Sequence, residues 1–389
     1  MSDEISGRPA RQPPGGMSTA IVQRGPIDGW LLAVVVFLLL IGEVMVFSTS
    51  YFHAFERFDD PYRFFWKHQL AILVGSLGLI VAMSVPSATY RWLAYPLLAL
   101  ALVGLCVVFL PGVSSGRIHR WIHVGPINFQ PSELAKGAAV FYLAASLARK
   151  TERIRDFFYG VVPHLLVVGS MIVLIVLEPD LGGAVSVGLV LFAMLFAAGA
   201  RFRHLIALAT CGVVLFICAT LMANYRLDRI VSFFKANEHK QGHSYQLNQS
   251  LIAFGAGGVN GVGLGESRQK MFYLPEAHTD FIFAVVGEET GLVGGGCIIV
   301  LFALLAFCGL RIALRHPHVF GRLLAFGCTF LLVSQAGLNM GIVLGLLPTK
   351  GLPLPFISYG GSSLVMTLVY AGVLLSLSRE SLRENQVYA

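Results

Sequence analysis

The chain has 389 residues, of which 56% are hydrophobic and only 13% are charged, and its formal net charge is +7. Soluble domains carry about 25% charged residues, so this composition excludes an ordinary soluble domain and indicates a membrane protein. The basic residues gather at the ends of apolar segments, a pattern that argues against nucleic-acid binding. All six cysteines lie within apolar segments without a CxxC pair, so we expect no disulfide framework and no cysteine metal site.

Ten apolar segments follow residues 1–27, whose content of Pro, Gly, Arg and Ser predicts a disordered tail. Each segment is close to or longer than the roughly 20 residues that a membrane-spanning helix needs. We therefore predict an all-α, polytopic membrane protein with about ten transmembrane helices over residues 28–380, followed by a short tail at 381–389. The segments are approximately residues 30–49, 69–85, 91–111, 132–149, 161–178, 181–199, 204–223, 280–312, 321–347 and 360–378.

Clusters of Lys and Arg follow the fourth, sixth, eighth and tenth segments, and short cytoplasmic loops are enriched in these residues. This pattern predicts that both termini are cytoplasmic. The large loop at 224–279, between the seventh and eighth helices, is then extracytoplasmic, and it is too long for a simple connector. Residues 245–254 within it have amphipathic helical spacing. The other extracytoplasmic loops are those at 50–68, 112–131, 178–181 and 348–359.

The predicted extracytoplasmic side carries more basic residues than the positive-inside pattern favours. A concentration of cations there suggests an anionic ligand at the outer face of the membrane. The residues concerned are Arg117, Arg120, Arg226, Arg229, Lys235, Lys240, Arg268, Lys270 and Lys350.

A polar segment opens the fourth apolar helix, where Pro131 and Ser132 mark a helix start. Glu133 and Lys136 follow three residues apart, so their side chains share a helix face and can form an ion pair. An ion pair inside a membrane is costly and requires a reason. Structural clamping and contact with a substrate are both open explanations for it.

Two other breaks between apolar segments carry polar groups. At Glu178-Pro179-Asp180 the proline interrupts a helix, and the carboxylates require water or partners. Residues 348–363 contain three prolines and repeated glycine, which predict a rigid loop that re-enters a helix at Gly360 to Ser363. The N–H groups at such a helix start favour an anion, with an ordinary helix cap as the alternative.

Asp280 lies where the long polar loop meets the eighth apolar helix, immediately before Phe281. A carboxylate at such a junction is expensive to keep and is a functional candidate by default. It could cap the helix, because acidic groups are favoured in a first turn, or it could act as a general base toward an attacking hydroxyl. Glu288 and Glu289 lie about 12 Å deeper at 1.5 Å per residue, and we expect them to be buried and paired.

These segments together resemble motifs of the SEDS family of shape, elongation, division and sporulation proteins, over about residues 28 to 380. Within the family, residues 274–278 and 348–351 resemble the cell-division members more than the elongation members. Glu178 and Gly183 depart from the pattern, because many members have Gln and Thr there. The segments that carry the resemblance are 120–122, 130–136, 179–182, 245–250, 275–283 and 353–363.

The resemblance implies a peptidoglycan glycosyltransferase, a hexosyltransferase that polymerises lipid II at the outer face of the bacterial cytoplasmic membrane. Asp280 matches the essential aspartate of the family, which is thought to deprotonate the 4-hydroxyl of the acceptor sugar. Glu133 and Lys136 match a pair considered structural or regulatory, and undecaprenyl pyrophosphate is the leaving group. The implied partners are a class B penicillin-binding protein and other membrane proteins of the divisome.

We assign candidate roles to the remaining polar residues from their charge and their side of the membrane. A divalent cation could neutralise the pyrophosphate, although the sequence shows no dedicated metal cage. Asp180, Glu288 and Glu289 are assigned structural or regulatory roles. The candidate substrate-binding residues are Arg120, Gln130, Arg229, His278, Lys350, Ser362 and Ser363.

Two other classes of protein remain as alternatives. A lipid II flippase or other transporter would suit the many spans and the intramembrane carboxylates, although no clear internal repeat is visible. A non-catalytic scaffold of the division machinery would not need Asp280.

Overall fold

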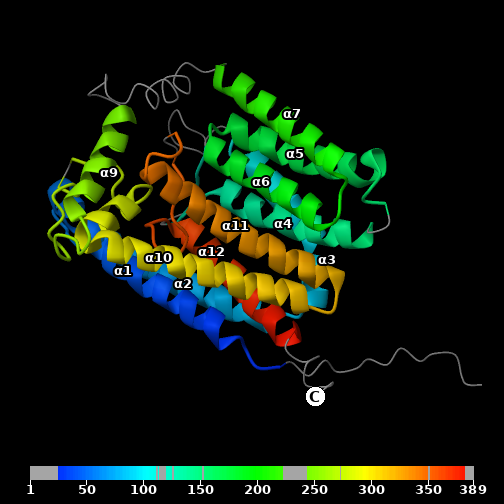
Figure 1. Ribbon diagram of the computed structural model, residues 1–389, viewed down its shortest axis with the longest axis horizontal. Coiled ribbons are helices and arrows are strands. Elements are labelled where there is room, and N and C mark those ends of the chain that lie inside the picture. The colour runs from blue at the N-terminus through cyan, green and yellow to red at the C-terminus, as the bar shows by residue number, and fades with distance from the viewer. Residues whose placement is uncertain are drawn as a thin grey trace, which may run out of the picture.

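The computed structural model describes residues 25–110, 113, 120–124, 127–150, 153–221, 243–271, 273–348 and 351–381, so Arg229 and Lys350 lie outside the described residues. Helices dominate the described part, together with one hairpin of two short strands (Figure 1). The elements are α1 (Gly29–Phe58), α2 (Arg63–Ser84), α3 (Ser87–Val107), β1 (Ile122–Val124), β2 (Ile127–Phe129), α4 (Pro131–Arg149), the π-helix η1 (Phe157–Val161), α5 (Val162–Leu177), α6 (Leu181–Ala197), α7 (Phe202–Leu221), α9 (His243–Gly257), α10 (Ile282–Arg315), α11 (Val319–Val343) and α12 (Gly361–Ser381).

All the helices except α9 run side by side through one bundle, and they correspond one to one with the ten predicted spans (Figure 1). Among the described residues, seven helices are long and apolar enough to cross a membrane, and α6 and α7 hold shorter apolar helices. The remaining one, α4, has 19 residues and carries the predicted pair Glu133 and Lys136. The prediction of an all-α polytopic membrane fold is therefore confirmed.

The predicted loop at 50–68 is mostly helical, which corrects its boundaries. α1 continues to Phe58, where Asp59 adopts a left-handed conformation with φ of 55° and ends the helix. α2 then begins at Arg63. The apolar runs underestimated the lengths of α1 and α2, because the ends of these two helices carry polar side chains. The predicted amphipathic helix at 245–254 is confirmed as the middle of α9.

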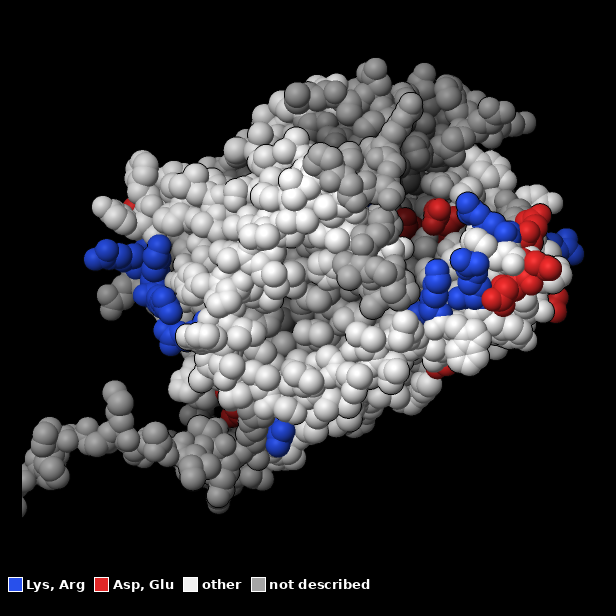
Figure 2. Space-filling view, turned by 180° about the vertical axis from the view of Figure 1, so that it is seen from behind, with Lys and Arg blue, Asp and Glu red and all other residues white. Residues whose placement is uncertain are grey.

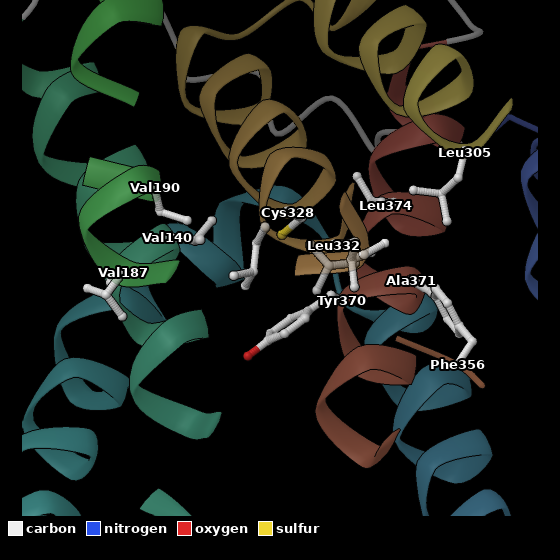
Figure 3. Close-up of a cluster of buried hydrophobic side chains, with 14 of the residues drawn as sticks. Val140, Val187, Val190, Leu305, Cys328, Leu332, Phe356, Tyr370, Ala371 and Leu374 are labelled. Atoms are coloured by element: carbon white, nitrogen blue, oxygen red, sulfur yellow. The ribbon is translucent and has the colours of Figure 1, made fainter. Parts of the chain in front are cut away.

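The centre of the bundle is filled by α4, α6, α11 and α12, whose buried side chains interdigitate (Figure 3). Small residues let these helices approach closely, as is usual where lipid removes the ordinary hydrophobic drive between helices. Gly137 is an example, because a Cβ there would lie 2.5 Å from the Tyr370 hydroxyl. The core therefore fixes the start of α4 against α12.

The two ends of the described chain lie side by side, since Gly25 donates a backbone hydrogen bond of 3.0 Å to the Arg379 carbonyl. Asp28 adds an ion pair with Arg311 and caps α1. Charged side chains gather at the two ends of the molecule, with a white belt between them (Figure 2). An uncharged belt between two charged ends is the surface expected of a protein that spans a membrane, because Lys and Arg are enriched at the ends of the spans.

Candidate active site

A cavity of about 580 Å³ lies at the end of the bundle opposite the termini. Its walls come from the starts of α2, α4, α6 and α12, the hairpin, and the turn before α10. Alternate helices of an up-and-down bundle start at the same end, so polar residues far apart in the sequence meet here. The predicted site residues that line the cavity are Arg120, Gln130, Glu133, Lys136, Asp180, Asp280, Ser362 and Ser363.

Asp280 is a half-buried residue of the cavity wall, in the turn that precedes α10. The N-cap residue of α10 is Phe281, whose side chain makes no capping hydrogen bond, so Asp280 lies one residue before the N-cap position. The main chain of the residue is held from α11, because Asn339 Nδ2 donates to the Asp280 carbonyl at 2.8 Å.

The Asp280 carboxylate lies against the backbone of Gly351, where a Cβ would be only 2.7 Å from Oδ2. Glycine is therefore the residue that lets the 351–353 loop approach the carboxylate.

Gly351→Ala should displace this carboxylate. If Asp280 is the base that the family resemblance implies, the glycosyltransferase activity should fall about tenfold or more, since small misplacements of a reacting group are costly. The measurement is the initial rate of glycan formation from lipid II. Gly337→Ala on α11 is the control, because a Cβ there meets nothing within 4 Å. Equal rates for the two variants would contradict the prediction.

Glu133 and Lys136 form the ion pair that their spacing predicts, with Lys136 Nζ 2.8 Å from Glu133 Oε2. Both side chains are buried, and Lys136 also donates to Gln335 Oε1 at 2.9 Å. The Tyr370 hydroxyl donates to the Glu133 carbonyl at 3.0 Å. Because the pair lines the cavity and ties α4 to α11, clamping and substrate contact are both compatible with its position.

Asp180 joins α6 to the start of α4. Its Oδ1 accepts from the Gly183 N–H at 2.9 Å and so caps α6, while Oδ2 accepts from the Ser132 hydroxyl at 3.1 Å. Ser362, at the start of α12, accepts from the Gln130 N–H at 3.2 Å and donates to the Asn128 carbonyl at 2.9 Å. These contacts fix the hairpin and three helix starts around one rim of the cavity.

Arg120 reaches across the same rim, and its Nε donates to the Glu178 carbonyl at 3.0 Å. Its Nη2 donates to the Pro179 carbonyl. The guanidinium thus binds the two carbonyl groups that follow α5, and Arg120 also lines the cavity.

A family model described as cell cycle protein, which groups FtsW, RodA and SpoVE, matches residues 29–383. The chain belongs to this family. It is the SEDS family that the sequence motifs resemble, and this chain is a multi-pass membrane protein.

Two relatives of this SEDS protein cover almost the whole chain. A probable peptidoglycan glycosyltransferase FtsW from Geobacter sulfurreducens is 43% identical over 365 residues, which cover 93% of this chain and 97% of that protein. Stage V sporulation protein E of Bacillus subtilis is 42% identical over 358 residues, with 91% and 97% covered.

Solved structures of the family share the fold. A chain from a peptidoglycan synthase complex that coordinates polymerization and crosslinking has a TM-score of 0.77 at 28% identity, with 92% of this chain and 99% of that chain covered. Thermus thermophilus RodA, the rod shape determining protein, has a TM-score of 0.68 at 28% identity, with 92% and 98% covered. These likenesses agree with the helical bundle described above.

His278 was predicted as a substrate ligand, but it is not among the residues that line the cavity. Its ring packs in an aromatic cluster with His53, Phe64 and Tyr359, at centroid distances of 5.4, 5.3 and 5.7 Å. Burial lowers the pKa of His278 to about 4, so the ring is neutral near pH 7. The SEDS chain uses this ring to hold the 276–281 turn against α1 and α2.

Glu288 and Glu289 are buried and paired, as the sequence predicted, in a network separate from the cavity lining. Glu289 accepts from Lys270 Nζ at 2.7 Å, and Glu288 accepts from the Arg268 N–H at 3.0 Å and from Ser267. α10 is broken beside them at Gly291, where φ is 66°. The network fixes the segment after α9 to the first part of α10.

Glu178 follows the last residue of α5 and is fully buried, and neither carboxylate oxygen has a hydrogen-bond partner in the described part of the chain. Burial and then the neighbouring Asp180 raise the pKa of Glu178 to about 8. The folded protein therefore holds this carboxyl group protonated at neutral pH, where it resembles a glutamine in charge and shape.

Glu178→Gln should therefore stabilise the protein at neutral and alkaline pH. The unfolded chain ionises near 4.5, so wild-type stability falls as pH rises from about 4.5 to about 8. The difference at pH 7 is about 3 kcal/mol by the linkage relation. Melting temperatures in detergent at pH 5, 7 and 9 measure it. A wild-type curve parallel to that of Glu178→Gln at all three pH values would refute the protonated state.

Several cavity residues were missed by the sequence reading. His68 on α2 lines the cavity, is 1% exposed, and has no hydrogen-bond partner for Nδ1 among the described residues. Lys67 and Tyr359 line the cavity too. Polarity at the start of an apolar segment was the only sequence signal for Lys67 and His68, which fall within the predicted loop at 50–68, whereas Tyr359 belongs to the 353–363 segment that carries the family resemblance.

Within the described ranges, no group of three or more His, Cys, Asp or Glu side chains is arranged to hold a metal ion. The cations that line the cavity there are Lys67, Arg120 and Lys136. Four carboxylates line the same cavity, those of Glu133, Asp180, Glu276 and Asp280, and Lys136 is ion-paired with Glu133. Among the described side chains, Lys67 and Arg120 therefore offer the positive charge that an anion could use.

Proposed function

We propose that this chain is a peptidoglycan glycosyltransferase that polymerises lipid II into glycan strands at the outer face of the cytoplasmic membrane during septal wall synthesis. The observation that carries the proposal is the Asp280 carboxylate on the wall of a cavity that also holds Arg120 and Lys67. Such a cavity offers a base and cations to a substrate that carries hydroxyl groups and a pyrophosphate. The FtsW relative at 43% identity over almost the whole chain supports the same activity.

In the proposed reaction, the Asp280 carboxylate takes the proton of the 4-hydroxyl of the acceptor sugar. The acceptor oxygen then forms a bond to the anomeric carbon of the donor chain. The bond between that carbon and the pyrophosphate oxygen breaks, and undecaprenyl pyrophosphate leaves with the electron pair. Arg120, together with Lys67, stabilises the negative charge of the leaving group electrostatically.

We propose further that the chain works at the division septum with a class B penicillin-binding protein, whose transpeptidase crosslinks the new strand. The similar chain from a peptidoglycan synthase complex that coordinates polymerization and crosslinking supports such a pairing.

The test is polymerisation of labelled lipid II by the purified full chain with its transpeptidase partner in proteoliposomes. Long glycan products, separated by electrophoresis, are the expected result. A parallel measurement follows labelled lipid II across the bilayer. Translocation without polymer would instead favour a flippase, and neither activity would favour a scaffold. Two controls exclude polymer from other sources. The transpeptidase alone should form no polymer, and a transpeptidase with an inactivated active site should still support polymerisation by this chain.

A further inference from the structure

Asn339 on α11 joins two segments that meet at the cavity. Its Nδ2 donates to the Asp280 carbonyl at 2.8 Å and to the Leu352 carbonyl at 2.6 Å. The residue is 1% exposed and is not part of the cavity lining. Both neighbours are acceptors, so the amide nitrogen must face them, and only a group with two N–H donors can serve both.

Gln335 lies one turn earlier on the same face of α11 and makes a similar pair of contacts. Its Nε2 donates to the Pro353 carbonyl at 3.0 Å, and its Oε1 accepts from Lys136 Nζ at 2.9 Å. The two amides therefore tie the 351–353 loop, the Asp280 turn and the buried ion pair of α4 to one helix.

We infer that Asn339 is a positioning residue, which holds the Asp280 main chain and the 351–353 loop in one fixed relation so that the carboxylate stays on the cavity wall. The inference rests on the proposed role of Asp280 as the base. Gly351 begins the tethered loop and already contacts the carboxylate, so a slip between the two segments would displace the reacting oxygen directly.

The hydrogen bonding of Asn339 favours positioning over stability alone. Its Oδ1 is buried without a partner in the described part of the chain, so the amide is only half satisfied. A buried polar atom without a partner costs free energy, which offsets part of what the two donated bonds contribute. The presence of an amide with an unpartnered oxygen at this position is better explained by the geometry that Asn339 imposes on Asp280.

The test compares Asn339→Leu and Asn339→Asp with wild type in lipid II polymerisation. Leu has similar volume and Asp has the same shape, and neither can donate two hydrogen bonds. We expect kcat to fall about 10- to 100-fold, as for a small misplacement of a reacting group, with KM changed less than threefold. Ser334→Ala, on the same helix and away from the cavity lining, is the control and should keep wild-type kinetics.

A double-variant comparison separates positioning from a general structural role. In an Asp280→Asn background, Asn339→Leu should cause no further loss of the residual rate, because there is no carboxylate left to position. The same fold loss in both backgrounds, or a rise in KM with kcat unchanged, would overturn the inference. Full activity of Asp280→Asn alone would instead refute the proposed base. If Asn339→Leu does not fold, Asn339→Asp supplies the same comparison.

Discussion

Asp280→Asn should reduce lipid II polymerisation by at least about 100-fold, because an amide keeps the shape of the carboxylate but cannot accept the hydroxyl proton. The main-chain tether to Asn339 does not involve the side chain, so the turn should stay in place. The initial rate of glycan formation in proteoliposomes measures the effect. The melting temperature should change by only a few degrees.

The matched control for this substitution is Asp59→Asn, at the exposed C-terminal cap of α1. It makes the same chemical change at a left-handed position that asparagine tolerates well. Wild-type polymerisation by Asp59→Asn together with loss in Asp280→Asn would support the base. Full polymer from a folded Asp280→Asn protein would exclude proton transfer to this carboxylate.

Lys136→Met should destabilise the protein by about 3–5 kcal/mol, the usual cost of removing one partner from a buried ion pair. The change leaves the Glu133 carboxylate buried without its cation and removes the donor to Gln335. Thermal or denaturant unfolding in detergent measures the loss. Lys67→Met, at an exposed position on α2, should stay within about 0.5 kcal/mol of wild type.

A second substitution tests the cause of that loss. Glu133→Gln combined with Lys136→Met removes both charges, so the double variant should recover most of the lost stability. Equal instability of the single and double variants would show that the packing of the Lys136 side chain, and not its charge, supports α4.

The sequence predicted those features that depend on neighbouring residues. Apolar runs of span length predicted ten helices, because burying apolar surface in lipid is a property of each segment by itself. The pairing of Glu133 with Lys136 followed from a spacing of three within one helix. Asp280 was selected because a carboxylate at the edge of an apolar run is costly whatever lies around it.

Errors arose where local pattern and helix geometry differ. The polar ends of α1 and α2 look like a loop in sequence, yet they continue as helix, and this hid His68 from the reading. For His278, a predicted ligand, the sequence did not indicate that its ring packs against aromatic side chains from three other segments. Composition cannot separate these two roles, because the difference lies in the contacts.

By itself, then, the sequence determined the membrane location and the positions of the helices, and it selected Asp280, the acidic residue just before α10, as a candidate. Only the tertiary structure decided what surrounds that residue. Asn339 and Gly351 lie 59 and 71 positions beyond Asp280 in the chain, and no spacing rule joins residues so far apart. Helix packing brings them together, since α10, which follows Asp280, packs against α11, which carries Asn339 and leads into the loop with Gly351.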